Sequence, residues 1–238
     1  MAADEEAAEL VAAAPDGTAL RALVDRRVSG EPLAWILGTT RFCGIDLLVD
    51  PGVYVPRWQS ETLARRAADL LPTHGTGVDL CTGSGAVALV MQTARPSARV
   101  VATERNPLAA ACARRNGVAV REGHLFDPLP HDLAGVVDVL VGVVPYVPDD
   151  ALHLLPRDVV AFEPLEALAG GLDGLAVVGE VVDSSPRWVR PGGWLLLEVG
   201  GDQVEATQRR FTAGGYASVS VLTDGDGDPR GVAGRLRP

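Results

Sequence analysis

The most informative segment of the chain reads Val78-Asp79-Leu80-Cys81-Thr82-Gly83-Ser84-Gly85. Its apolar start predicts a strand, and its glycines predict a sharp turn that lets the backbone approach a ligand closely. A helix predicted at 86–95 begins directly behind this turn, and the N-terminus of a helix carries free backbone N–H groups. We therefore expect a ligand to lie over residues 81–85.

Glu104 ends the next predicted strand, nineteen residues beyond Gly85. A carboxylate at that point can accept hydrogen bonds from both ribose hydroxyls of an adenosine, as it does in dinucleotide-binding folds. The third glycine of the NAD-binding motif is missing, so no pyrophosphate needs to be held. The pattern therefore fits S-adenosylmethionine as the cofactor. The alternative is an ordinary strand-to-helix turn beside an exposed glutamate.

Around this segment the chain alternates helices and strands, which predicts an α/β fold. Such alternation implies a parallel sheet covered by helices on both faces, and we expect a Rossmann-like sheet of seven strands. The predicted strands span 77–80, 99–103, 119–121, 136–141, 193–199, 218–222 and 231–236, and the predicted helices span 60–71, 86–95, 107–116, 175–189 and 203–214.

A short helical arm and a β-hairpin are predicted ahead of this sheet. Residues 4–27 are rich in Ala, Leu and Glu with a Pro-Asp-Gly break, which indicates two short helices. Residues 42–55 place Pro51-Gly52 between two apolar runs, which indicates a hairpin that turns there. We therefore divide the chain into an arm, 1–56, and a sheet domain, 57–238.

The composition excludes several kinds of chemistry. All 21 basic residues are Arg, and without lysine there is no internal Schiff base and no phosphate-loop lysine. The formal net charge of −10 argues against a nucleic-acid partner. The three scattered cysteines predict neither a disulfide framework nor a metal site. The longest apolar stretch, 136–147, is too short to cross a bilayer, so we expect a cytoplasmic protein without a membrane partner.

Many short motifs follow one another in a fixed order: Gly30–Gly38, Phe42-x-Gly44, Val55–Arg57 with Glu61, Asp79–Gly85, Leu125–Leu129, Pro145–Pro148, Phe162–Pro164, Gly170–Gly174, Pro191–Leu195, Glu198-x-Gly200 and Gln203. In this order the chain resembles the HemK/PrmC family of protein-glutamine N-methyltransferases over nearly its whole length. The resemblance implies a class I methyltransferase fold, S-adenosylmethionine as cofactor, and a protein glutamine as methyl acceptor, as in a release factor.

The resemblance also implies a cofactor site. The acidic position near the cofactor adenine in the family is His124 here, and a neutral imidazole nitrogen can still accept a hydrogen bond from the adenine amino group. A polar residue without a ligand is the alternative for His124. The cofactor-binding residues implied are Asp79, Cys81, Thr82, Gly83, Ser84, Gly85, Glu104, His124, Leu125 and Val143.

The acceptor site departs from the family. Its Asn-Pro-Pro-Tyr motif, in which the Asn oxygen and the next backbone carbonyl accept the two amide hydrogens, corresponds here to Val143-Val144-Pro145-Tyr146. A half-paired amide in a dry site costs on the order of 1–3 kcal/mol, which is roughly a tenfold to hundredfold loss on glutamine. Pro145 and Tyr146 remain as a wall on which a planar substrate can stack. The catalytic residues implied are Val143, Pro145 and Tyr146.

Three residues of the segment 57–61 also have expected roles. Trp58 either forms a second wall of the acceptor site or packs under the hairpin, and Arg57 and Glu61 are expected to pair or to brace the cofactor loop.

Two functions remain open. One is a methyltransferase of this family, acting on a protein glutamine or redirected to a small-molecule nitrogen or oxygen nucleophile. The alternative is a non-catalytic S-adenosylmethionine-binding protein that has lost its acceptor site, but the glycine turn and Glu104 favour the enzyme.

Overall fold

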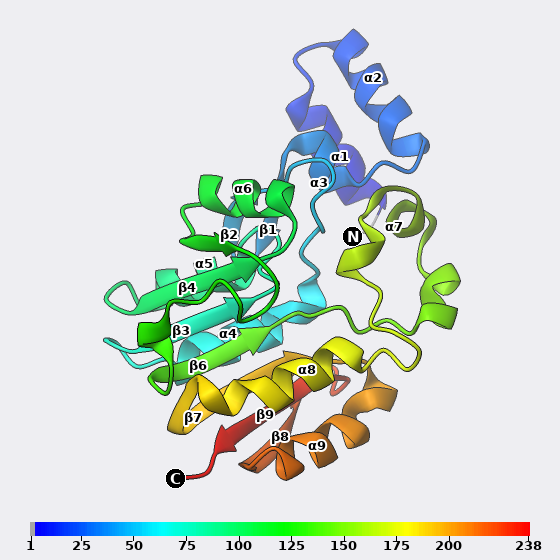
Figure 1. Ribbon diagram of the computed structural model, residues 1–238. Coiled ribbons are helices and arrows are strands. Elements are labelled where there is room, and N and C mark those ends of the chain that lie inside the picture. Colours follow the sequence, from blue (N-terminus) through cyan, green and yellow to red (C-terminus); the bar gives the residue numbers. More distant parts are fainter. Residues whose placement is uncertain (1–2) are drawn as a thin grey trace.

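A seven-stranded sheet forms the centre of the molecule (Figure 1). The computed structural model describes residues 3–238. The strands lie in the order β5-β4-β3-β6-β7-β9-β8, and all are parallel except β9, which runs antiparallel between β7 and β8. The predicted Rossmann-like α/β sheet is confirmed. Its strands are β3 (Thr76–Leu80), β4 (Arg99–Glu104), β5 (Val120–Glu122), β6 (Val137–Gly142), β7 (Val189–Glu198), β8 (Tyr216–Thr223) and β9 (Pro229–Leu236).

Helices cover both faces of the sheet because the central strands are apolar on both sides. Along β6, Val139 and Val141 pack against one face and Leu140 against the other, and all three are fully buried. The first face is covered by α4 (Glu61–Leu70), α5 (Ala86–Ala94) and α6 (Pro107–Arg115), and the second by α8 (Ala176–Ser184) and α9 (Val204–Ala213).

The connection of the strands places a crevice above the middle of the sheet. The chain leaves β3 for β4 and β5, and then returns to β6 on the opposite side of β3. In open parallel sheets, ligands bind beyond the carboxyl ends of the strands at this change of direction. Residues 81–85, Glu104 and Val143 all follow or end a strand at this edge.

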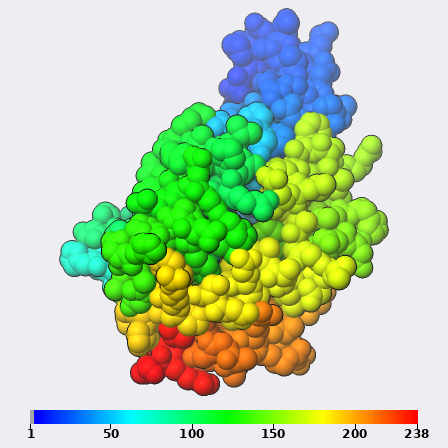
Figure 2. All heavy atoms as spheres, viewed as in Figure 1, coloured from blue at the N-terminus to red at the C-terminus, as the bar shows by residue number. Residues whose placement is uncertain are grey.

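The N-terminal helices project from one end of the molecule (Figure 2). They are α1 (Ala3–Ala13), α2 (Gly17–Val28) and α3 (Leu33–Leu37), and the two helices predicted in residues 4–27 are present. The side chain of Asp16 begins α2 by accepting hydrogen bonds from the backbone N–H groups of Thr18 and Ala19, both at 2.8 Å. Residues 1 and 2 of the predicted arm lie outside the described residues.

The position of the predicted hairpin turn was wrong. The hairpin pairs β1 (Thr39–Phe42) with β2 (Ile45–Leu48), and its turn is Cys43-Gly44 rather than Pro51-Gly52. Both turn residues have positive φ, 51° at Cys43 and 81° at Gly44, as a two-residue hairpin turn of type I′ requires. Pro51-Gly52 forms a separate turn after β2.

The predicted helix 175–189 was too long. Helix α8 ends at Ser184, a single 3-10 turn spans Ser185–Arg187, and Val189 already begins β7. Pro186 explains the break, because proline has no N–H to continue an α-helical hydrogen-bond ladder. Short helical segments not foreseen from the sequence include α7 (Arg157–Phe162). Within residues 3–238, no helix is long and apolar enough to span a membrane.

Candidate functional site

Asp79 fixes the glycine turn, residues 81–85, through two hydrogen bonds. Its Oδ2 accepts hydrogen bonds from the Thr82 hydroxyl at 2.6 Å and from the Ala88 N–H in the first turn of α5 at 3.0 Å. Gly85 caps α5 at φ +90°, and a Cβ there would come within 2.8 Å of Val118. The turn therefore has one well-determined shape, which only glycine fits at residue 85.

Burial raises the pKa of Asp79 to about 7, from an ordinary 3.8. The folded protein then binds this proton more tightly than the unfolded chain, so the stability contributed by Asp79 falls as pH rises between these two values. Asp79→Asn keeps an oxygen for Thr82 and Ala88 but cannot ionise. We therefore expect the free energy of unfolding of the variant, relative to that of the wild type, to rise by about 2–4 kcal/mol as the pH is raised from about 4 to about 8.

Urea denaturation at both pH values measures this difference. The control is Asp69→Asn at an exposed position of α4, for which we expect a change within about 0.5 kcal/mol. An Asp79→Asn gain that is equal at both pH values would contradict the prediction.

Glu104 lies beside the turn at the end of β4. Its Oε2 accepts a hydrogen bond from the Gly83 N–H at 2.9 Å, and its Oε1 accepts one from the Asn106 N–H at 2.8 Å. Each carboxylate oxygen has a further lone pair. The carboxylate is thus fixed in direction while keeping the capacity to accept from a ligand.

A cavity of about 210 Å³ opens between these groups and the end of β6. Of the residues implied for the cofactor, it is lined by Cys81, Gly83, Glu104, His124, Leu125 and Val143, together with Pro145. Asp79, Thr82 and Ser84 line a smaller cavity next to it instead, and Gly85 lines neither. His124 is paired through Nε2 with Glu180 on α8 at 2.9 Å.

The first cavity, of about 210 Å³, has the chemistry that an adenosine ligand would need. Its walls are largely apolar, as Leu125 and Val177 illustrate, and Glu104 is the carboxylate that a ribose needs. Thr103 also lines it, and the buried hydroxyl of Thr103 has no hydrogen-bond partner within residues 3–238.

A second cavity, of about 460 Å³, lies on the other side of Val143. Tyr146 and Glu198 line it, and the Tyr146 hydroxyl donates a hydrogen bond to Glu198 Oε1 at 3.0 Å. Val143 and Tyr54 line both cavities, so the two spaces meet at these side chains. Groups bound in the two cavities therefore approach each other at Val143.

Trp58 does not pack under the hairpin. Trp58 is 58% exposed at the wall of the second cavity, and the guanidinium of Arg230 lies over its ring, 5.3 Å from the ring centroid. The first alternative, a wall of the acceptor side, is the one compatible with this position.

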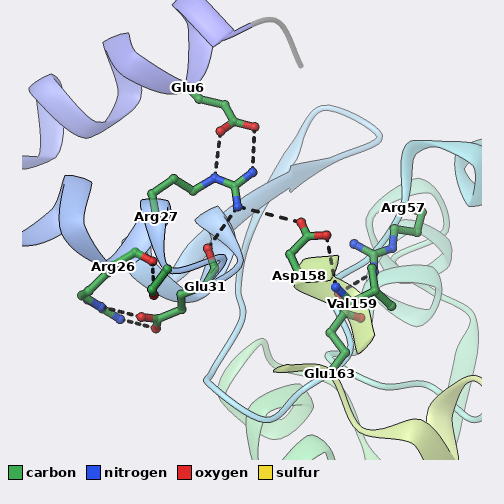
Figure 3. Close-up of polar contacts among 9 residues, drawn as sticks. Glu6, Arg26, Arg27, Glu31, Arg57, Asp158, Val159 and Glu163 are labelled. Atoms are coloured by element: carbon green, nitrogen blue, oxygen red, sulfur yellow. Dashed lines mark hydrogen bonds and ion pairs between the residues drawn. The ribbon is translucent and has the colours of Figure 1, made fainter. Parts of the chain in front are cut away.

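The predicted pairing of Arg57 with Glu61 was wrong. Arg57 instead pairs with the buried Glu163, while Glu61 accepts a hydrogen bond from the Cys43 N–H and pairs with Arg65. Figure 3 shows the Arg57–Glu163 pair beside α7.

The same view shows how the arm reaches this region. Arg27 of α2 lies between Glu6 of α1, at 2.8 Å, and Asp158 of α7, at 3.8 Å (Figure 3). Asp158 and Arg57 both line the second cavity. The N-terminal helices are thus tied by charge to one wall of the acceptor side.

Gln203 holds the backbone of the Pro145-Tyr146 segment. Its side-chain amide donates to the carbonyl oxygens of Tyr146 at 2.8 Å and Asp173 at 3.0 Å, and its oxygen accepts from the Gly200 N–H at 2.9 Å. A Cβ on Gly174 would come within 2.1 Å of the Tyr146 carbonyl oxygen, so this packing requires glycine there.

Gln203→Glu should destabilise the protein by about 1–3 kcal/mol, because both carbonyl oxygens lose their donor and face a carboxylate instead. Urea denaturation measures the effect. The control is Gln208→Glu, at a half-buried position of α9, for which a change within about 0.5 kcal/mol is expected. Equal effects of the two substitutions would contradict the role of Gln203.

Comparison with known proteins shows the family of this chain. The chain is 38% identical over 224 residues to the release factor glutamine methyltransferase of Geobacter sulfurreducens, covering 92% of this chain and 78% of the relative. It is 39% identical over 229 residues to the enzyme of the same name from Mycolicibacterium smegmatis, covering 92% and 80%. The chain belongs to the release factor glutamine methyltransferase family. The resemblance to HemK/PrmC proteins is confirmed, and the chain is a methyltransferase.

A solved structure supports the fold of this family member. A methyltransferase from Pyrococcus furiosus has a TM-score of 0.59 at 18% identity, covering 92% of this chain and 97% of that one. No family model matches the chain.

Two residues that line the second cavity, Tyr54 and Glu198, had no predicted role. Tyr54 directly precedes the Val55-Pro-Arg57 motif, and this position next to a motif could have indicated that Tyr54 belongs to the site. Glu198 was part of a quoted motif, but only the pairing of β6 with β7 brings it beside Val143. Within residues 3–238, no group of three or more His, Cys, Asp or Glu side chains is arranged to hold a metal ion.

Proposed function

We propose that this protein transfers a methyl group from S-adenosylmethionine to the side-chain nitrogen of a release factor glutamine. The observation that carries the proposal is that Val143 and Tyr54 line both cavities. A donor bound in the first cavity and an acceptor bound in the second would meet there.

The first cavity supplies groups suited to the cofactor. Glu104 would bind the ribose hydroxyls, His124 and Leu125 would lie at the adenine, and residues 81–85 would lie under the methionine part. Val143 lies between this space and the second cavity. When bound, S-adenosylmethionine supplies an electrophilic methyl group on a positively charged sulfur.

The residues of the chain contribute mainly by positioning. Holding the nucleophile in line with the methyl group supplies much of the reduction in the barrier. Tyr146 would bear on one face of the planar acceptor in the second cavity, and Gln203 keeps the Tyr146 backbone in place, whereas Pro145 lines the first cavity. No strong base is needed to begin such a displacement.

A small-molecule nitrogen or oxygen nucleophile is the second candidate acceptor. Val143 favours it, since an apolar side chain stands where the family has an amide that binds glutamine. The release factor is preferred because the curated relatives carry that substrate in their names.

Labelled S-adenosylmethionine distinguishes the candidates. The protein is incubated with it and either a bacterial release factor or a mixture of cell metabolites. Label in the release factor supports the proposal, and label only in small molecules supports the second candidate. Cofactor binding with no transfer to anything would favour the non-catalytic alternative.

A further inference from the structure

Glu198 ends β7 beside the residue that departs from the family. In the parallel pairing of β6 with β7, Gly142 lies opposite Leu197. The next residues along the two chains are Val143 and Glu198, so they leave the sheet side by side. A carboxylate thus stands next to the position where an asparagine would have bound the acceptor amide.

One oxygen of this carboxylate is left without a partner. Glu198 is 2% exposed, and its Oε1 accepts the hydrogen bond from Tyr146, but its Oε2 has no hydrogen-bond partner within residues 3–238. Gln59 Oε1 is also buried without a partner, and both residues line the second cavity. Buried acceptors without donors are costly, so their gathering at one cavity indicates a ligand that brings N–H groups.

The cations around this cavity do not neutralise Glu198 directly. Arg230 pairs with Asp224 at 2.6 Å and with Asp228 at 3.3 Å, and Arg57 pairs with Glu163. These guanidinium groups already have carboxylate partners. The buried Ser60 hydroxyl faces the Glu198 carboxylate but makes no hydrogen bond to it within residues 3–238, so Oε2 remains available to a ligand.

The titratable and charged groups that face Glu198 are Tyr146, Tyr54 and Arg230. Burial raises the pKa of Glu198, while the Ser60 and Tyr146 hydroxyls and Arg230 lower it in part. Loss of the carboxylate form on acidification is therefore expected at a higher pH than for an exposed glutamate.

We propose that Glu198 binds the reacting nitrogen of the acceptor, its free Oε2 accepting a hydrogen bond from the N–H group, and receives a proton from that nitrogen. The proposal rests on the proposed function. As the new nitrogen–carbon bond forms, the sulfur–methyl bond breaks and its electron pair stays on sulfur. The methylated nitrogen then carries one proton too many, and this proton passes to the Glu198 carboxylate.

This role also limits the class of acceptor. A carboxamide or an amine offers an N–H group to the carboxylate, whereas a carboxylate acceptor would place two negative charges together in a buried site. Glu198 thus selects nitrogen nucleophiles that carry hydrogen and excludes carboxylate nucleophiles.

The test uses Glu198→Gln, which keeps the shape of the side chain but cannot take a proton. At saturating S-adenosylmethionine we expect kcat/KM on a bacterial release factor to fall at least tenfold, with cofactor affinity unchanged. The fall of activity at acidic pH that we expect for the wild type should disappear in the variant. The control is Glu205→Gln, an exposed position of α9, with wild-type kinetics expected.

A binding measurement separates this inference from the proposed function. N-acetylglutamine amide is titrated into the full protein loaded with S-adenosylhomocysteine, and binding is followed by NMR shifts. Binding by the wild type that weakens at least fivefold in Glu198→Gln supports the inference, even if no release factor is methylated. Equal binding by both proteins, or binding by neither, overturns it, as does a kcat/KM within twofold of the wild type.

Discussion

Replacing Glu104 with Ala will weaken S-adenosylmethionine binding at least tenfold and reduce methyl transfer in proportion at low cofactor concentration. Hydrogen bonds from a ligand to a charged acceptor contribute about 1.5–3 kcal/mol each, and the ribose is expected to make two of them. The substitution also removes the acceptor of the Gly83 and Asn106 N–H groups, which would loosen the glycine turn. Isothermal titration calorimetry measures the dissociation constant directly.

A matched control lies on the neighbouring strand. Glu122 is opposite Glu104 in the pairing of β4 with β5, but it is exposed and pairs with Arg114. Glu122→Ala should therefore leave the dissociation constant within twofold of the wild type. If Glu104→Ala binds the cofactor as tightly as the wild type, the assignment of the ribose to this carboxylate is wrong.

Val143→Asn will raise kcat/KM on a release factor glutamine by roughly tenfold to hundredfold. The new side-chain oxygen would accept an amide hydrogen that is otherwise left unpaired, which is a gain on the order of 1–3 kcal/mol. Val143 lines both cavities and is only partly buried, so a side chain of similar size can enter the same space. Steady-state kinetics at saturating cofactor measure the gain.

Val143→Leu is the control, because it changes the volume without adding an acceptor, and it should give no gain. Cofactor affinity should be similar in both variants. If Val143→Asn gains nothing while it still folds and binds the cofactor, the divergence of the acceptor site extends beyond this residue.

Local patterns predicted the fold well because each strand and helix has its own signature. The turn at 81–85 and the helix behind it are an example, since the spacing of apolar residues and glycines fixes both. The hairpin was misplaced because Pro51-Gly52 has stronger turn chemistry than Cys43-Gly44, and only the pairing of β1 with β2 decides between them.

The site was harder to predict, because its contacts join distant parts of the chain. Arg57 forms an ion pair with Glu163, 106 residues away in the sequence, and not with Glu61, which is only four residues away. Glu198 comes beside Val143 only through the register of two strands that are far apart in the sequence. Motifs marked the right segments, but pairings between segments follow from topology.

The most direct test of the central claim is mass spectrometry of a bacterial release factor after incubation with this protein and S-adenosylmethionine. The account predicts one added methyl group, on the side-chain nitrogen of a single glutamine, and at least tenfold slower addition with Glu104→Ala at low cofactor concentration. A protein that binds the cofactor but adds no methyl group to any glutamine, or that methylates only other residue types, would contradict it.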